Sequence, residues 1–151
     1  MYKKLLSAGV AVIVGASAGY AVNAFAQQKP ETLLKQRQGA MALQGKYFGP
    51  LNAMAQGKVP YNAQIVVRNA GYLQALSEMP WDGFTPETKD EKSRALPAVW
   101  TDAAQWKEGQ DRLQSAVAKL VAAKGEEAAA KAAIGEVNKA CGACHEHFRA
   151  K

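Results

Sequence analysis

The sequence predicts an all-α protein, an antiparallel four-helix bundle. No segment shows a convincing alternation of apolar and polar residues, the pattern of a half-buried strand. Apolar residues instead recur every three or four positions in four segments, which we predict as helices at about 30–56, 62–78, 102–124 and 126–150. Short links join the outer pairs of segments and one long connection joins the middle pair, so neighbouring helices are expected to run antiparallel.

The first 26 residues resemble a secretory signal. Lys3 and Lys4 form a positive start, residues 5–14 form an apolar run, and residues 24–26 match the small-x-small cleavage pattern. We therefore expect cleavage before Gln27, export to the periplasm and a mature domain at 27–151. An uncleaved membrane anchor is the alternative, but glycine, serine and asparagine dilute the apolar run after residue 14.

The charge of the chain gives little support for nucleic-acid binding. The formal net charge of +6 falls to +4 once the two signal lysines are removed, and the remaining basic residues are interspersed with acids. A nucleic-acid site would need a basic stripe or patch. Docking to acidic partner proteins stays open.

The first helix begins at Pro30, because proline suits the first turn of a helix. Residues 49–50 (Gly-Pro) are expected to kink or end it, and residues 57–60 to end it. Its apolar stripe repeats every seven residues, at Leu34, Met41 and Phe48.

The second helix follows Asn62, a plausible N-cap, and stops at residues 79–80 (Met-Pro). Its expected apolar side carries Ile65, Tyr72 and Leu76, with Val66 and Leu73 beside them. Residues 81–100 are rich in proline, glycine and charge and form the one long connection, a feature that is often functional in a compact domain.

The third and fourth helices carry recognisable end signals. Asp102 is expected to cap the third, and residues 124–125 (Lys-Gly) to close it. Acids at 126–127 suit the start of the fourth helix, and bases suit its end. Its apolar stripe proceeds in steps of four and three residues: Ala130, Ile134, Val137, Cys141, Cys144 and Phe148.

The most informative motif is Cys-Gly-Ala-Cys-His at 141–145. Cys141 and Cys144 continue the buried stripe, and His145 lies one turn beyond Cys141, so all three side chains are expected to face the core. In the attachment of c-type haem, each thiol forms a thioether and the histidine supplies an axial iron ligand. The motif predicts one covalently bound haem c near the C-terminus.

Three other interpretations of the motif are open. A structural zinc site needs four ligands, which here would be Cys141, Cys144, His145 and His147. His147 lies about 200° around the helix from His145, so its side chain is not expected to converge with the other three. A thioredoxin-like dithiol is expected to open a helix within a βαβ unit, whereas this motif closes one. Two buried core cysteines with a chance histidine remain the plainest alternative.

The late position of the motif restricts the second axial ligand. Six residues follow His145, none of them methionine. His147 is too close to His145 on the helix to reach the opposite face of the haem, and the chain holds no third histidine, so we do not expect two histidines of the same chain to bind the iron. A sixth ligand would come from upstream, where the candidates are Met41, Met54 and Met79.

Five stretches spread over essentially all of 27–151 carry a resemblance to a known family. They are KPETLLKQRQGAM at 29–41, GKVPYNA at 57–63, LSEMPWDGF at 76–84, AVWTDAAQWK at 98–107 and CGACHEHFRAK at 141–151. In these stretches the chain resembles the class II cytochromes c, and cytochrome c′ in particular. The resemblance implies a twisted four-helix bundle, a homodimer, and a five-coordinate high-spin iron whose apolar distal face admits nitric oxide or carbon monoxide.

On the side of the axial histidine, the resemblance implies that Cys141 and Cys144 form the thioethers and that His145 binds iron. Arg149 would flank this proximal pocket. Its plainer role is to stabilise the helix C-terminus by its charge.

On the opposite side, the resemblance places Arg37 and Gln38 against the haem edge, where a guanidinium can neutralise a propionate. A solvated helix face is the alternative for Gln38. Met41 would lie over the distal iron face, either as a residue that blocks the site or, as in the low-spin branch of the class, as an iron ligand.

The functional expectation is a periplasmic haem c protein that exchanges single electrons with an unidentified redox partner, binds small diatomic gases, or does both. The alternative is a low-spin electron carrier with Met41 as the sixth ligand. No acid–base pair or activated nucleophile lies near the motif, so we do not expect an enzyme.

Overall fold

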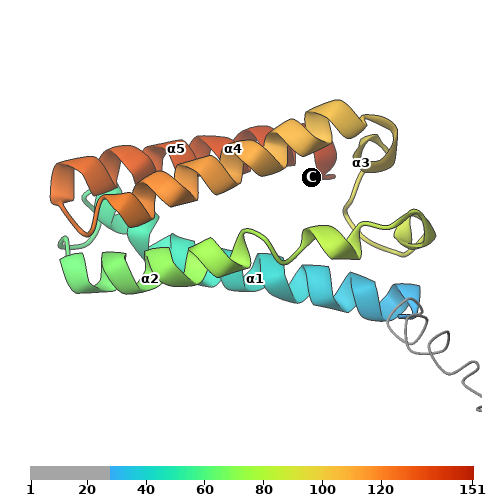
Figure 1. The fold of residues 1–151 in the computed structure, drawn as a ribbon, viewed down its shortest axis with the longest axis horizontal. Coiled ribbons are helices and arrows are strands. Elements are labelled where there is room, and N and C mark those ends of the chain that lie inside the picture. Colours follow the sequence, from blue (N-terminus) through green and yellow to red (C-terminus); the bar gives the residue numbers. More distant parts are fainter. Residues whose placement is uncertain (1–27) are drawn as a thin grey trace, which may run out of the picture.

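The computed structural model describes residues 28–151 and confirms the predicted four-helix bundle (Figure 1). The predicted signal at 1–26 lies outside the described residues. Across residues 28–151, no helix is both long and apolar enough to cross a membrane. The four long helices are α1 (Pro30–Ala55), α2 (Ala63–Leu76), α4 (Ala103–Ala122) and α5 (Glu127–Phe148).

The helices form two layers. Figure 1 shows α1 and α2 side by side below α4 and α5. Within the layers α1 packs against α2 and α4 against α5, and between the layers α2 contacts α4 and α1 contacts α5. The first turns of α1 and the last turns of α5 therefore lie at the same end of the bundle.

The expected helix starts are made by local hydrogen bonds. Asn62 and Asp102 each accept a bond from the backbone N–H three residues later, at 3.0 and 3.2 Å. Glu126 accepts from two backbone N–H groups of the first turn of α5, at 3.0 and 2.7 Å. These side chains satisfy donors that have no partner within the helix.

Helix α1 passes through Pro50 and ends only at Ala55. Proline removes one helical hydrogen bond, yet Leu51 and Met54 beyond it are 0% and 5% exposed. Burial of these two side chains offsets the lost bond, because a fully buried leucine or methionine contributes roughly 1.5–3 kcal/mol.

The buried face of α2 differs from the expected one. Val66 and Leu73 lie in the core, whereas Tyr72 is 46% exposed and its ring lies 4.8 Å from that of Tyr47. The expected buried side of α2 was wrong because it counted Tyr72 as an apolar core residue. The buried residues of α2 are Val66, Asn69, Ala70, Leu73 and Leu76.

The close-packed core contains residues of all four long helices. Its fully buried members include Leu51, Val66, Leu120 and Ile134. The core lies toward the end of the bundle that holds the α1–α2 and α4–α5 turns. It lies away from the opposite end, where α1 begins and α5 ends.

The connection between α2 and α4 is structured. It contains three short helices: η1 (Trp81–Gly83), η2 (Pro86–Thr88) and α3 (Ala98–Thr101). In Figure 1 it crosses from one layer to the other at the end of the bundle that holds the C-terminus.

A short antiparallel bridge joins this connection to the chain just after α5. The N–H of Leu96 donates to the carbonyl of Phe148 at 2.9 Å, and the N–H of Ala150 donates to the carbonyl of Arg94 at 2.8 Å. The last turn of α5 is therefore tied to the connection as well as to the bundle.

Candidate haem site

A cavity of about 690 Å³ lies between the two layers, toward the C-terminal end of α5. This size is typical of small-molecule and cofactor sites, which are roughly 300–1,000 Å³. All seven residues singled out in the sequence line the cavity: Arg37, Gln38, Met41, Cys141, Cys144, His145 and Arg149. Residues about a hundred positions apart are thus brought into one site.

The two cysteines are half-buried on the α5 wall and are not joined to each other. Burial raises the pKa of Cys141, and burial and the neighbouring Cys141 raise the pKa of Cys144. Both thiols are therefore protonated at neutral pH, unlike the acidic thiols of redox dithiols. Gly109 of α4 lies opposite Cys144, and a Cβ there would be 3.7 Å from its Sγ.

The imidazole of His145 has surroundings that suit a metal ligand. Burial lowers its pKa, and the charges of Arg149 and then Arg94 lower it further. The ring is consequently neutral at pH 7, the form that offers a nitrogen lone pair to a metal.

The second histidine is directed elsewhere. His147 Nε2 lies 3.4 Å from a carboxylate oxygen of Asp102, and His147 does not line the cavity. Among residues 28–151 there is no group of three or more His, Cys, Asp or Glu side chains arranged to hold a metal ion.

The structure separates the three candidate methionines. Met41 is half-buried and lines the cavity from α1. Met54 is 5% exposed within the core, and Met79 is 56% exposed after α2. Neither of these two lines the cavity, so only the Met41 thioether is available to a group bound there.

Aromatic side chains form one wall of the cavity. The Trp106 ring lies 5.5 Å from Trp81, 4.8 Å from Phe84 and 4.9 Å from Phe148, in edge-on contacts. We did not assign this wall from the sequence, because two of its rings come from the connection. The signal was present as the aromatic pair within WDGF at 81–84.

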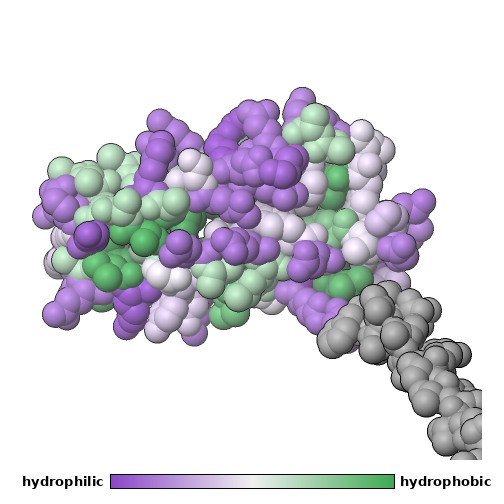
Figure 2. Space-filling model, in the orientation of Figure 1, coloured by the Kyte–Doolittle hydropathy of each residue, from purple (hydrophilic) through white to green (hydrophobic). Residues whose placement is uncertain are grey.

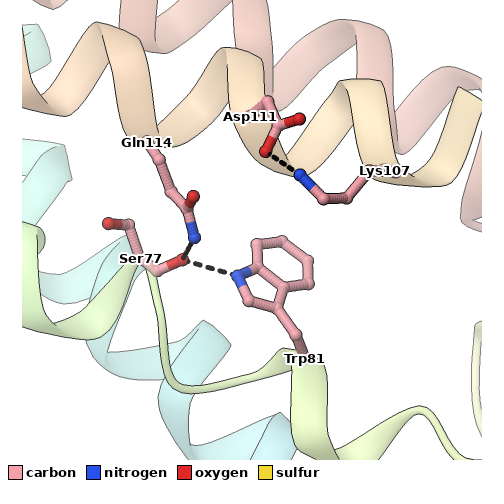
Figure 3. Close-up of polar contacts among 5 residues, drawn as sticks. All are labelled: Ser77, Trp81, Lys107, Asp111 and Gln114. Atoms are coloured by element: carbon pink, nitrogen blue, oxygen red, sulfur yellow. Dashed lines mark hydrogen bonds and ion pairs between the residues drawn. The ribbon is translucent and has the colours of Figure 1, made fainter.

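A hydrogen bond fixes the tryptophan of the connection (Figure 3). The carbonyl of Ser77, just past α2, accepts from Trp81 Nε1 at 2.7 Å and from Gln114 Nε2 of α4 at 3.5 Å. The Lys107–Asp111 ion pair lies along α4 nearby. The indole N–H is thereby satisfied, and the apolar face of the ring remains available to the cavity.

Arg37 is buried, only 3% exposed, and most of its polar contacts are with the connection. Its guanidinium donates to the Gly83 carbonyl at 2.7 Å, Thr88 Oγ1 at 2.9 Å and Ser93 Oγ at 3.1 Å. It also lies 4.4 Å from the centre of the Phe84 ring. Arg37 thus anchors the connection to α1 as well as lining the cavity.

This guanidinium has no ion-pair partner among the described side chains. Burial lowers its pKa, and the charge of Glu91 opposes that shift. A buried cation without a paired anion is costly, so an anionic group entering the cavity would be favoured beside it.

Two further expected residues, Gln38 and Arg149, line the cavity and are exposed. From the connection, exposed Arg94 and half-buried Ser93 and Ala95 line it. The length and composition of the connection indicate a functional role but do not identify which of its residues line the site. Arg94 was not singled out, since a lone arginine in a charged loop carries no specific signal.

Comparison with known proteins agrees with this geometry. The family model described as Cytochrome C' matches residues 32–149. The chain is 42% identical to cytochrome c' of Rubrivivax gelatinosus over 127 residues, which cover 82% of this chain and 98% of that protein.

Solved structures give the same result. The crystal structure of the Rubrivivax gelatinosus cytochrome c' has a TM-score of 0.77 at 41% identity, covering 82% of this chain and 98% of that one. A nitrosyl complex of a variant of cytochrome c prime from Alcaligenes xylosoxidans has a TM-score of 0.75 at 37% identity, covering 82% and 99%.

A four-helix bundle with a cavity lined by two thiols and a neutral imidazole defines a c-type haem protein. The chain belongs to the cytochrome c′ family. Members of this family carry covalently bound haem c with its iron, and the donor set and size of the cavity fit that group.

The contact between α1 and the connection allows a direct stability test. A Cβ at Gly83 would lie 2.7 Å from both Arg37 Cβ and the Leu33 carbonyl oxygen. We expect Gly83→Ala to lower the free energy of unfolding by about 1–3 kcal/mol, measured by urea unfolding of the haem-loaded protein.

Gly135→Ala is the matched control, because Gly135 lies within α5 with no heavy atom within 4 Å of the added Cβ. Alanine is the better helix former, so this control is expected to stabilise the protein by up to about 1 kcal/mol. Equal effects of the two substitutions would contradict the close contact.

Proposed function

We propose that this protein is a periplasmic haem c protein that cycles its iron between ferric and ferrous states by one electron and binds nitric oxide or carbon monoxide at a five-coordinate iron. One observation carries the proposal. Of the residue types that commonly bind haem iron, the cavity offers one histidine and one methionine besides the two cysteines of the attachment motif.

The haem supplies the redox centre and the gas-binding position, and the side chains supply attachment and orientation. The sulfurs of Cys141 and Cys144 would hold the group covalently against α5, and the imidazole of His145 would bind the iron. Arg37 and Gln38 line the cavity from α1, where they would supply a positive charge and an amide to the carboxylates of the haem.

One part of the α1 wall favours small uncharged ligands. Arg37 and Gln38 line the cavity from the start of α1, but Met41, Ala42, Gly45 and Phe48 beyond them bring no charge to it. An anion or a large polar ligand would lose hydration there without gaining new hydrogen bonds, whereas a diatomic gas loses little. The nitrosyl complex of the Alcaligenes xylosoxidans relative supports the same ligand class. We propose no enzymatic activity.

The alternative is that Met41 binds the iron and makes the protein a low-spin electron carrier. The position of Met41 on the cavity wall is the observation that favours it, because neither of the other two candidate methionines lines the cavity. A thioether ligand would occupy the sixth position and exclude gases.

Ferric visible and electron paramagnetic resonance spectra separate these two functions. We expect a high-spin signal, no methionine-to-iron charge-transfer band, and an unchanged spin state in Met41→Leu. A low-spin signal whose band disappears in Met41→Leu would establish the carrier. Met79→Leu is the control, because Met79 lies outside the cavity.

A homodimer is the proposed assembly. All five large hydrophobic residues exposed between residues 28 and 151 belong to α1, α2 or the segments that follow them, and none belongs to α4 or α5. They are Leu43, Val59, Val67, Tyr72 and Met79. Figure 2 shows hydrophobic surface interspersed with hydrophilic surface over the α2 side of the bundle.

A second copy of the chain is the proposed occupant of this surface, because the exposed large hydrophobic residues belong to the α1–α2 layer and an isologous contact uses the same surface of both copies. We expect Val67→Lys to convert a dimer to a monomer in sedimentation equilibrium. Ala132→Lys, on the exposed face of α5, is expected to leave the dimer intact. A monomeric wild-type protein at micromolar concentration would contradict the assembly.

The location is proposed from the first 26 residues and from the haem type. Expression of the full chain in a Gram-negative host is expected to give haem-loaded protein in the periplasmic fraction, with Gln27 as its first residue by N-terminal sequencing. Unprocessed protein in the membrane fraction would indicate an anchor instead.

A further inference from the structure

Arg94 lies where the connection meets the end of α5. Its side-chain Nε donates to the Ala150 carbonyl at 2.9 Å, and its own carbonyl accepts from the Ala150 N–H at 2.8 Å. The residue is therefore held by the chain just after α5, through both its backbone and its side chain. It also lines the cavity, together with His145 and Arg149.

The charge of Arg94 acts on the site from a second direction. Arg149 lies one turn after His145 on the same stretch of chain, whereas Arg94 comes from the opposite strand of the short bridge. Both arginines line the cavity alongside His145, so two positive charges reach the site from different segments of the chain.

Neither arginine is neutralised locally. No carboxylate among the described residues lies within ion-pair distance of Arg94 or Arg149. A positive charge held beside a redox centre disfavours its more positive, oxidised state.

We propose that Arg94 sets the electron affinity of the haem by holding a positive charge in the wall of the cavity, close to the end of α5. The inference rests on the proposed ligation of iron by His145. Addition of one electron converts ferric to ferrous iron and lowers the charge of the site by one, so the guanidinium stabilises the reduced form relative to the oxidised form.

The test is a redox titration of haem-loaded protein against an electrode with mediators. We expect Arg94→Gln to lower the equilibrium constant for reduction about two- to fivefold, the range for a single partly solvated charge. This corresponds to a decrease of roughly 20–40 mV, at 59 mV per tenfold change for one electron. Arg94→Lys, which keeps the charge, is expected to retain most of the wild-type value.

Lys58→Gln is the matched control, since it removes an exposed positive charge from the α1–α2 turn at the far end of the bundle. We expect it to leave the potential unchanged. Raising the ionic strength is expected to bring the wild-type potential toward that of Arg94→Gln, because exposed charges are screened.

Two outcomes would overturn the inference. In one, the potential of Arg94→Gln equals that of Lys58→Gln, so the charge of Arg94 has no effect on the iron. In the other, the potential of Arg94→Lys is as low as that of Arg94→Gln, so the effect does not come from charge. The ferric spectrum of each variant shows separately whether haem and its ligation are intact, so failure of the proposed function itself is recognised independently.

Discussion

The structure depends on keeping a cavity of about 690 Å³ open inside a four-helix bundle, whose interior would otherwise close-pack. The core near the two short turns holds the helices together, and it leaves the cavity toward the other end. There the layers are bridged by the connection between α2 and α4. The edge-on aromatic contacts around Trp106 and the buried Arg37 hold this connection in place, so the cavity is shaped by protein contacts as well as by the haem.

Charge at the site follows from the same arrangement. Arg37 approaches the cavity from α1, Arg94 from the connection and Arg149 from the end of α5, and no described carboxylate pairs with any of them. Three separate elements thus bring positive charge to a group that carries propionates and an iron whose charge changes. An anion would stabilise the buried Arg37 most, because this guanidinium has lost most of its contact with water. The exposed Arg94 and Arg149 attract the anionic group mainly at longer range.

Local signals in the sequence predicted the helices well, since each depends on neighbouring residues. Asn62 and Asp102 cap the helices that follow them, and the cysteines continue the apolar stripe of α5. The exceptions depend on packing between elements. Helix α1 continues past Pro50 because of burial on the far side, and the face of α2 turned inward is decided by its neighbours, which leave Tyr72 half-exposed.

The sequence by itself determined the fold class and the attachment motif at 141–145, and with them haem c as the cofactor, because helical periodicity and the spacing of two thiols and an imidazole are local properties. Only the tertiary structure decided which residues join that motif around the cavity. It selected Met41 over the other two candidate methionines, directed the side-chain hydrogen bonds of Arg37 to the connection, and brought Arg94 to the same cavity as His145. These contacts join residues tens of positions apart, and no local pattern specifies how two helix layers and the connection between them meet.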